Sequence, residues 1–381
     1  MSKQWPKVTL GEVLRHRKEF ITIDDLTNYK RPRAQLHAQG IVLRDEIPGA
    51  LIKTKTQQVC RAGEFLVAEI DAKLGGFGIM PESLEGSIVS SHYFLFGIDE
   101  SKLERRFLDF FIRTPAFREQ VTAQGSTNYA AIRPTHVLGY EIPLPPLAEQ
   151  RRVVARIEGL VAQIHEIKNI RTEEETELRQ MLLGAFGSIA KNAPRVAMRQ
   201  AAPLVRRPPN IEPSELYGEL GIRSFGKGTF HKPALSGFDL GSKRIFRIEK
   251  GDLLFSNVFA WEGAIAVAKS EDDGRFGSHR FMSCVPKPDI ATADFLRFYF
   301  LTNDGIELIR AASPGGAGRN RTLGIEALAH IEVPVPSIEK QRWFDALQAE
   351  VDALKRLQAE TKAELDALMP SILDRAFSGA L

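Results

Sequence analysis

At residues 144–164, LPPLAEQRRVVARIEGLVAQI, a pattern of strands and turns gives way to that of a long helix, and this change sets the architecture. Pro145 and Pro146 stop the preceding strand and suit a first helical turn, where a missing N–H costs nothing. Glu149 falls in that turn, where a carboxylate suits the positive end of the helix dipole. Apolar residues then recur every three or four positions. They predict a helix over residues 147–189, which would be roughly 65 Å long.

A weaker copy of this stretch lies further along the chain. The segment IEVPVPSIEKQR, residues 331–342, faces YEIPLPPLAEQR, residues 140–151, at a shift of 191 residues. A shift of 188 residues aligns Gly40 with Gly228, and the same shift aligns further glycines along both halves. Matched glycines mark turns and therefore indicate a shared fold. We interpret the chain as two repeated halves. Chance matching in a glycine-rich sequence is the alternative.

The pattern in each half of the sequence predicts a domain of short strands and short helices, followed by a long helix. The segments AGEFLVAEI (residues 62–70) and KGDLLFS (250–256) are apolar and strand-length. The segments RFLDFFIRT (106–114) and DFLRFYFLT (294–302) resemble short amphipathic helices. The predicted class is α+β with pseudo-twofold internal symmetry. The predicted order is a first domain over residues 1–146, a helix over 147–194, a second domain over 195–336 and a second helix over 337–381.

The two long helices carry apolar stripes that must be buried. In the second helix Phe344, Val351 and Leu365 belong to a heptad-like seam with polar interruptions. The simplest arrangement is an antiparallel coiled-coil pair within the chain. Independent bundle helices and homodimeric coiled coils are the alternatives. Pro370 should kink the second helix or break it.

Composition limits the possible functions. The chain has 381 residues and a net charge of +3, which suits two or three domains and permits DNA contact without requiring it. Cys60 and Cys284 cannot supply a disulfide framework or a four-thiolate metal site. There is no signal-like start and no apolar run of about 20 residues. The expected location is therefore cytoplasmic, with no membrane contact.

Four segments resemble the specificity subunits of type I restriction–modification systems. They are residues 144–164, the AFSGAL segment at 376–381, and GEFLVAEIDAKLGGFGIM and KGDLLFSNVFAWEGAIAVA at 63–80 and 250–268. The resemblance implies two target-recognition domains that read a split target on double-stranded DNA. It implies that the helices act as a coiled-coil spacer and dock two methyltransferase subunits, with room for a restriction motor–nuclease subunit. S-adenosylmethionine, ATP and magnesium are expected only on those partners, and no cofactor on this chain.

Candidate DNA contacts are polar side chains in segments that the repeat places at matched positions. Phosphate contacts favour Lys and Arg, and base readout favours Arg, Asn, Gln and aromatic residues. His37, Gln57 and Gln58 belong to the same polar segments. The first half supplies Lys30, Arg31, Arg33, Gln35, Lys53, Lys55, Asn128, Tyr129 and Arg133. The second half supplies Arg223, Lys227, Lys232, Lys243, Arg319, Asn320 and Arg321.

Candidate partner-docking residues lie at the starts of the two long helices. The second copy keeps Gln-Arg but replaces Leu-Ala-Glu with Ile-Glu-Lys, so its docking surface differs from the first. The candidates are Leu147, Glu149, Gln150, Arg151, Gln341 and Arg342.

No catalytic motif is convincing. The segment GIRSFGKG (residues 221–228) fails as a phosphate-binding loop, because Gly228 stands where Ser or Thr must ligate magnesium. Glu69, Asp71 and Lys73 resemble a nuclease site only superficially, since the matched positions in the second half lack these groups. We expect a non-catalytic DNA-reading subunit. A cryptic nuclease and a scaffold that binds no DNA are the alternatives.

Overall fold

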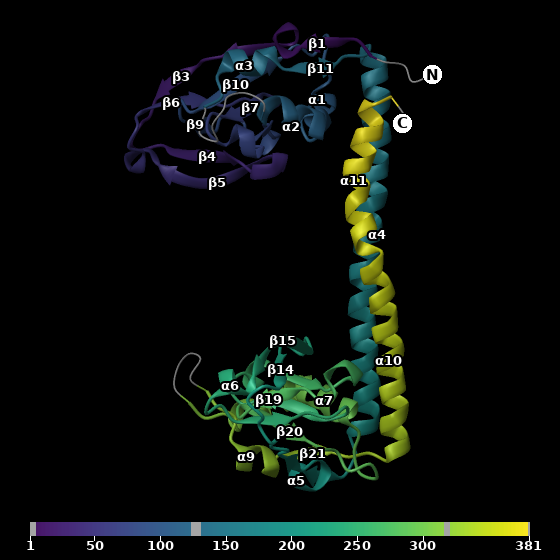
Figure 1. The fold of residues 1–381 in the computed structure, drawn as a ribbon. Helices are drawn as coiled ribbons and strands as arrows, with labels where there is room; N and C mark the ends of the chain where they lie inside the picture. The colour runs from purple at the N-terminus through teal and green to yellow at the C-terminus, as the bar shows by residue number, and fades with distance from the viewer. Residues whose placement is uncertain (1–4, 123–130, 316–320, 380–381) are drawn as a thin grey trace. The chain divides into compact units, whose positions relative to one another are not determined.

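The computed structural model describes residues 5–122, 131–315 and 321–379 (Figure 1). The chain divides into two compact units. The N-terminal unit comprises Met1–Arg171 together with Ala359–Leu381, and the central unit is Thr172–Gln358. Within the described ranges, no helix has an apolar stretch long enough to cross a bilayer.

The N-terminal unit is built from antiparallel sheets. A four-stranded sheet has the order β2-β10-β7-β8, a three-stranded sheet the order β3-β6-β9, and β4-β5 forms a hairpin. Its strands are β1 (Lys7–Thr9), β2 (Leu14–Arg17), β3 (Phe20–Thr22), β4 (Asn28–Ala34), β5 (Ile41–Pro48), β6 (Thr56–Val59), β7 (Phe65–Ala68), β8 (Phe77–Ile79), β9 (Ile88–Val89), β10 (Tyr93–Ile98) and β11 (Glu141–Pro143). Its helices are α1 (Arg105–Phe111), α2 (Pro115–Thr122), α3 (Pro134–Gly139), the first part of α4 (Leu147–Ala190) and α11 (Lys362–Phe377), with short turns η2 (Leu36–Ala38) and η4 (Asp71–Leu74).

The central unit repeats this plan. Its sheet β13-β20-β17-β18 corresponds to β2-β10-β7-β8, and a second sheet has the order β15-β14-β19-β16. Its strands are β12 (Arg195–Ala197), β13 (Leu204–Val205), β14 (Leu216–Ile222), β15 (Thr229–Ser236), β16 (Ile245–Arg247), β17 (Leu253–Ser256), β18 (Ile265–Val267), β19 (Phe276–Ser278), β20 (Phe281–Cys284) and β21 (Glu332–Pro334). Its helices are α5 (Met198–Ala201), α6 (Gly237–Leu240), α7 (Ala293–Leu301), α8 (Asn303–Ala311), α9 (Ile325–His330), the rest of α4 and α10 (Ile338–Glu360), with the turn η6 (Ala260–Glu262).

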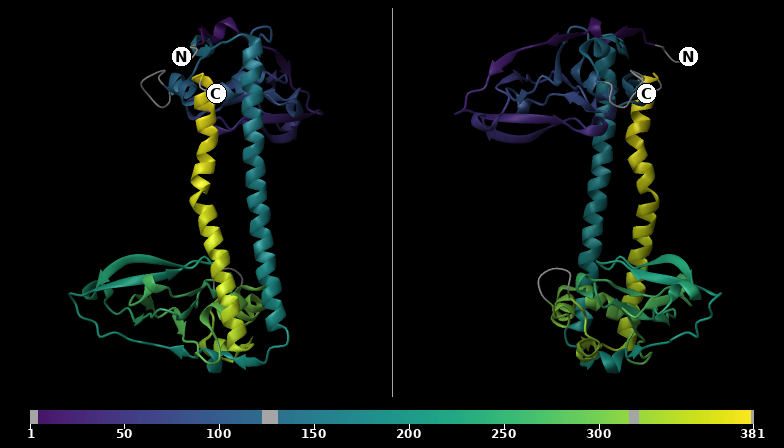
Figure 2. Two further views of the ribbon diagram at one scale, coloured as in Figure 1. Left: turned by 90° about the vertical axis from the view of Figure 1, so that its right-hand side faces the viewer. Right: turned by 60° about the vertical axis from the view of Figure 1, so that its left-hand side comes forward.

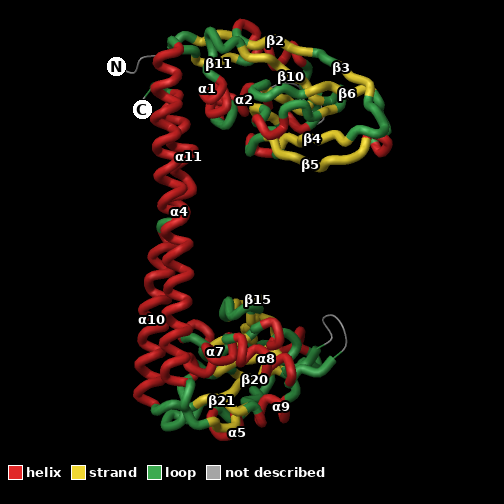
Figure 3. The backbone as a smooth tube through the Cα atoms, turned by 180° about the vertical axis from the view of Figure 1, so that it is seen from behind, coloured by secondary structure: helices red, strands yellow, loops and turns green. Residues whose placement is uncertain are grey.

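The predicted strands and short helices are present. β7 and β17 fall in the two apolar runs, and α1 and α7 fall in the two amphipathic runs. Helix α7 packs against β17 and β18, with helices beside the strands of this unit in Figure 3. The α+β class and the internal repeat are thus confirmed, and they follow from apolar periodicity that switches between the strand and helix patterns.

The core of the N-terminal unit includes residues far apart in the sequence. Phe65, Phe107 and Phe117 are completely or almost completely buried. The ring of Phe377, at the end of α11, lies 5.0 Å from that of Phe107 and 5.2 Å from that of Phe111. Helix α11 therefore completes a core that α1 begins.

Within each unit, α4 lies antiparallel to a segment of the second helical stretch. In the N-terminal unit Lys168 Nζ contacts Asp366 Oδ1 at 2.8 Å, and α4 and α11 run side by side in Figure 2. In the central unit the ring of Phe186 in α4 lies 5.6 Å from that of Phe344 in α10, in a tilted arrangement. The predicted antiparallel pairing is therefore confirmed within each unit.

The second helical stretch is interrupted at a different place from the one predicted. The residue between α10 and α11 is Thr361, whereas Pro370 lies inside α11. Of the two outcomes predicted for Pro370, a kink or a break, the break is wrong, because Pro370 lies within continuous helix. Proline lacks an N–H, but an interior proline does not end a helix when packing on both sides of it holds the helix in place. Leu365 and Leu373 of α11 are both buried.

Candidate nucleic-acid interface

The turn of the β14–β15 hairpin, residues 223–228, is fixed by main-chain hydrogen bonds. The N–H of Arg223 donates to the carbonyl of Gly228 at 2.9 Å and closes the turn. The N–H of Gly226 donates to the carbonyl of Gly263 at 2.8 Å, and the N–H of Phe225 to that of Glu262 at 2.9 Å. These two bonds hold the turn against η6. Two side chains add to this, because Arg223 donates to the carbonyl of Thr229 at 2.6 Å and Ser224 Oγ donates to Glu262 at 3.0 Å.

The N-terminal unit contains the same turn in the β4–β5 hairpin, at residues 35–40. The N–H of Gln35 donates to the carbonyl of Gly40 at 2.9 Å, and the N–H of Ala38 to that of Gly75 at 2.9 Å. Each bond matches one in the central unit at the shift of 188 residues. We call these two segments the hairpin turns. They have a common backbone but share few side chains.

Cations and aromatic rings gather around the central hairpin turn. The guanidinium of Arg223 lies 4.9 Å from the ring of Phe230, and Lys227 Nζ lies 5.9 Å from the ring of Phe225. The guanidinium of Arg321 lies 5.5 Å from the ring of Trp261, which belongs to η6. The structure thus brings together three predicted residues that are up to 98 positions apart in the sequence. Cations and ring faces are groups that suit phosphates and bases.

A cleft of about 360 Å³ opens beside the N-terminal hairpin β4–β5. Arg31, Lys53 and Tyr93 are among its lining residues. Arg31 makes a two-pronged ion pair with Asp45 at 2.7 and 2.8 Å, and this hydrogen bonding holds the pKa of the Asp45 carboxyl below its usual range. Arg44 also contacts Asp45, at 3.1 Å. Arg31 neutralises the charge of Asp45, so Arg44 and Lys53 leave the cleft with a net positive charge.

Several other predicted DNA contacts are engaged with the protein itself. Arg133 pairs with Glu69 at 2.8 Å, and Lys243 pairs with Glu219. Lys55 pairs with Asp25 and donates to the carbonyl of Gly49, and Lys30 Nζ lies 3.4 Å from the carbonyl of Ser83. These contacts position the loops that carry them. Arg33, Lys53 and Lys232 are exposed, and Gln35 is half-buried.

Two predicted loop residues are corrected, and four others are not described. Gln57 and Gln58 are buried in β6, where Gln58 Nε2 donates to the carbonyl of Tyr93 at 2.8 Å. Gln57 Nε2 donates to the nearby carbonyl of Thr54 at 2.7 Å, and neither side chain is on a reading loop. Asn128, Tyr129, Arg319 and Asn320 lie outside the described residues.

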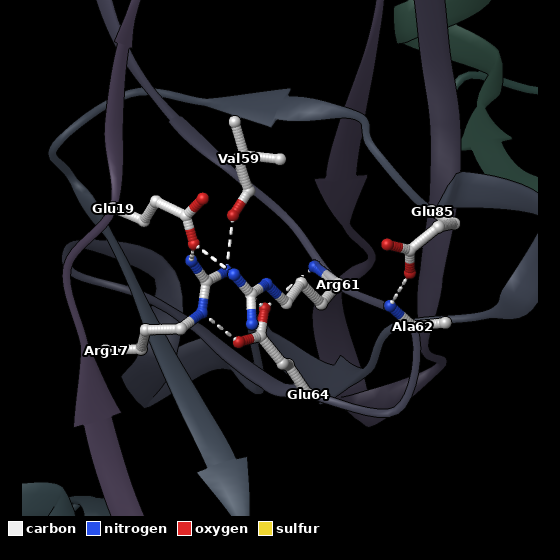
Figure 4. Close-up of polar contacts among 7 residues, drawn as sticks. All are labelled: Arg17, Glu19, Val59, Arg61, Ala62, Glu64 and Glu85. Carbon is white, nitrogen blue, oxygen red and sulfur yellow. Dashed lines mark hydrogen bonds and ion pairs between the residues drawn. The ribbon is translucent and has the colours of Figure 1, made fainter.

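An arginine–carboxylate ion pair with a buried carboxylate supports a sheet in each unit, and sequence reasoning missed both; Figure 4 shows the one in the N-terminal unit. Arg17 of β2 pairs with both carboxylate oxygens of Glu64, one of them at 2.7 Å, and with Glu19 at 2.8 Å. In the central unit Arg207 pairs with Asp252 at 2.7 and 3.1 Å. Each pair raises the pKa of its arginine through hydrogen bonding to the carboxylate. The sequence does contain a signal for these pairs, because the carboxylates Glu64 and Asp252 align at the 188-residue shift.

The predicted docking residues divide into buried and exposed groups. Gln150 and Gln341 are fully buried, so their prediction as partner contacts is wrong for this structure. Their side-chain amides are engaged in hydrogen bonds within their own units. Arg151 and Arg342 are exposed, and Leu147 and Glu149 are half-buried. Sequence reasoning missed Trp343, which follows Arg342 and is 52% exposed.

The segments that superficially resemble catalytic motifs have other geometries. Residues 221–228 join two antiparallel strands, whereas a phosphate-binding loop leads from a strand into a helix. Glu69 Oε2 lies 2.6 Å from His92 Nδ1, and its other oxygen binds Arg133. Within the described residues, no three His, Cys, Asp or Glu side chains gather in a way that could hold a metal ion.

Comparisons with known proteins match the whole chain to solved structures. No family model and no curated protein matches it. The HsdS subunit from Thermoanaerobacter tengcongensis is 26% identical, with 100% of this chain and 98% of that chain covered and a TM-score of 0.62. A chain from a type I restriction–modification system, solved to describe complex assembly and conformational transition, is 25% identical, with 100% and 99% covered and a TM-score of 0.69. The resemblance to specificity subunits of these systems is thereby confirmed.

Proposed function

We propose that this chain, which shares the fold of type I restriction–modification specificity subunits along its whole length, reads a bipartite sequence on double-stranded DNA. It is proposed to be non-catalytic and to act in the cytoplasm. Two methyltransferase subunits would perform the chemistry on the sites that it selects, and a restriction motor–nuclease subunit could join them. S-adenosylmethionine, ATP and magnesium would belong to those partners.

The observation that carries the proposal is the pair of hairpin turns. Two backbone hydrogen bonds of the N-terminal turn recur in the central turn at the 188-residue shift, yet Arg223 stands where the first half has Gln35. Base edges are read by side chains, whereas the scaffold positions them. Two readers with one backbone and different side chains suit two different half-sites. The cations around the central turn favour a polyanionic ligand over a protein partner.

The continuous helix α4 supports a spacer role. It has 44 residues and contributes to both units, where α11 and α10 pack against it. Readers of a split site must keep a set phase on the duplex, because the same face recurs only about every 34 Å. A helix pair is stiff enough for this, whereas a flexible linker is not.

Partner docking is proposed for the exposed residues near the start of each long helix. Arg151 and Arg342 occupy matched positions in the repeat, and Trp343 adds an exposed aromatic side chain beside Arg342. Arginine and tryptophan are enriched at the centres of protein interfaces. Two matched surfaces suit two copies of one methyltransferase.

The test is to express the chain with a methyltransferase encoded beside it and to map modified bases in the host DNA. The expected result is one bipartite methylated motif that disappears when this chain is omitted. Methylation that is the same with and without the chain would contradict the proposal. Magnesium-dependent cleavage by the purified chain would favour the nuclease alternative, and binding of partners without any salt-sensitive DNA binding would favour the scaffold.

A further inference from the structure

The two hairpin turns share positive φ at matched positions, and position 37/225 is the one where both turns carry a non-glycine residue. Among the described residues, His37, Ala38 and Phe225 are the non-glycine residues with positive φ, at 60°, 56° and 62°. His37 and Phe225 are separated by 188 residues, the same shift that aligns the hydrogen bonds of the turns. The left-handed conformation is therefore a repeated feature of the turn.

This conformation is costly for both residues. The side chain of a non-glycine residue crowds the backbone in the left-handed region, and bulky residues adopt it rarely. Glycine is already used nearby in the central turn, where Gly226 and Gly228 also have positive φ. Glycine at position 225 would form the same turn without crowding. The turn instead carries a phenylalanine there.

Packing does not compensate for the strain. The side chain of Phe225 is 74% exposed, and His37 is exposed as well. Phe225 contributes to the hydrogen bonds of the turn only through its main-chain N–H, so the ring adds little to its stability. Backbone strain that is held by the surrounding structure and not repaid by packing is characteristic of functional sites. Lys227, close to the ring of Phe225, makes this surface attractive to a phosphate backbone.

We propose that position 37/225 is the specificity-determining position of each hairpin turn, an inference that rests on the proposed function. The ring of Phe225 would make apolar contact with the methyl group of a thymine in the major groove of one half-site. The imidazole of His37 would hydrogen-bond to a base edge in the other half-site. The different side chains give the two turns different base preferences on one backbone.

The test uses asparagine, which tolerates the left-handed conformation better than most residues. Phe225→Asn and His37→Asn are each expressed with the methyltransferase, and the methylated motifs are mapped. We expect Phe225→Asn to relax an A·T position in one half-site, with a loss of discrimination of about 5- to 150-fold, and to leave the other half-site unchanged. We expect His37→Asn to relax only the other half-site.

Two controls keep the outcomes distinct. Phe238→Asn removes a ring that is 82% exposed at the other end of the same hairpin, and should leave the motif unchanged. Phe225→Gly keeps the turn and removes the ring, so it should act like Phe225→Asn even if the asparagine variant folds poorly. If wild type methylates no bipartite motif, the proposed function fails. If it does, and the variants at 37 and 225 keep both half-sites, only this inference is overturned.

Discussion

Gln150 and Gln341 make the same three hydrogen bonds in two different units. Gln150 Nε2 donates to the carbonyls of Lys102 and Pro145, both at 2.8 Å, and its Oε1 accepts from the N–H of Glu104 at 2.8 Å. Gln341 Nε2 donates to the carbonyls of Ile290 and Pro336 at 2.9 and 2.8 Å, and its Oε1 accepts from the N–H of Thr292 at 3.0 Å. The glutamine of the repeated Gln-Arg motif therefore ties each long helix to the segment that precedes α1 or α7.

Replacing either glutamine should loosen its unit. Gln150→Ala leaves two buried carbonyls and one N–H without partners, which costs about 2–4 kcal/mol at roughly 1 kcal/mol for each bond. We expect a lower Tm and faster amide hydrogen exchange at Glu104, measured by mass spectrometry. Arg151→Ala, at the exposed neighbouring position, should change stability by no more than about 0.5 kcal/mol. Equal effects of the two variants would contradict this role.

Removing Arg17 should leave a buried charge. Glu64 is 5% exposed, and Arg17 binds both of its oxygens. Arg17→Met should therefore lower the free energy of unfolding by about 3–5 kcal/mol. Adding Glu64→Gln should recover part of that loss, because the isolated charge is then gone. Arg61→Met removes a more exposed partner of Glu19 and should have a small effect. If the double variant is no more stable to unfolding than Arg17→Met alone, this explanation is wrong.

Asp345 should make the stability of the central unit depend on pH. Burial, with a contribution from nearby Asp294, raises the pKa of Asp345 to about 6. In the unfolded chain the pKa of this carboxyl is near 3.9. Its contribution to the stability of the fold is therefore complete below about pH 4 and is lost as the pH rises through about 6. Asp345→Asn should therefore add about 1–2 kcal/mol of stability at pH 7, reduced for partial exposure, and little at pH 4. Urea titrations at both values measure this.

The matched control for that measurement is Asp352→Asn, which changes an exposed carboxyl on the same helix. This variant should show the same difference in free energy of unfolding between pH 4 and pH 7 as the wild type. If Asp345→Asn also leaves that difference unchanged, Asp345 is not its source.

Lys227→Ala should weaken DNA binding in a salt-dependent way. A lysine that contacts phosphate releases about one counterion, so its loss should reduce the slope of log K against log salt by about 1. The binding should weaken on all sequences alike. Lys287→Ala removes the same charge from an exposed position between β20 and α7 and should leave the slope unchanged. A slope that falls equally for both variants would indicate only a loss of net charge.

Shortening the helix pair should shorten the preferred spacer between half-sites. Glu174 and Gln358 face each other at 2.9 Å, so residues 172–178 of α4 lie opposite residues 354–360 of α10. Deleting both segments keeps the seven-residue apolar repeat and removes about 10.5 Å of helix. At about 3.4 Å for each base pair, the methylated motif should lose about 3 base pairs of spacer. An unchanged spacer would refute the role of α4 in setting it.

Local patterns were enough to predict the elements but not their long-range contacts. The start of helix α4 at Leu147 is marked by the two prolines that precede it, and β17 was predicted from its apolar run. Gln150 looked like a surface residue, because its partners Lys102 and Glu104 are about 46 residues away. The break at Thr361 has no glycine or proline beside it to announce it in the sequence.

The candidate site was predicted in part for the same reason. Cations in turns are visible in the sequence, so Arg223 and Lys227 were found. The pairing of Arg133 with Glu69 joins positions 64 residues apart, and only the folded chain shows that this arginine is engaged. The strain at Phe225 has no signature in composition, since nothing in the sequence forces a left-handed phenylalanine between Ser224 and Gly226.

The contact between Phe377 and Phe107 has a consequence for biosynthesis. The central unit is one continuous stretch, whereas the N-terminal unit needs residues that are translated after all of it. As the chain leaves the ribosome, the first unit must wait with an unfinished core and an exposed apolar patch until Phe377 emerges. Apolar surface that stays exposed during that interval is prone to aggregation, so we expect the first unit to depend on chaperones until the chain is complete.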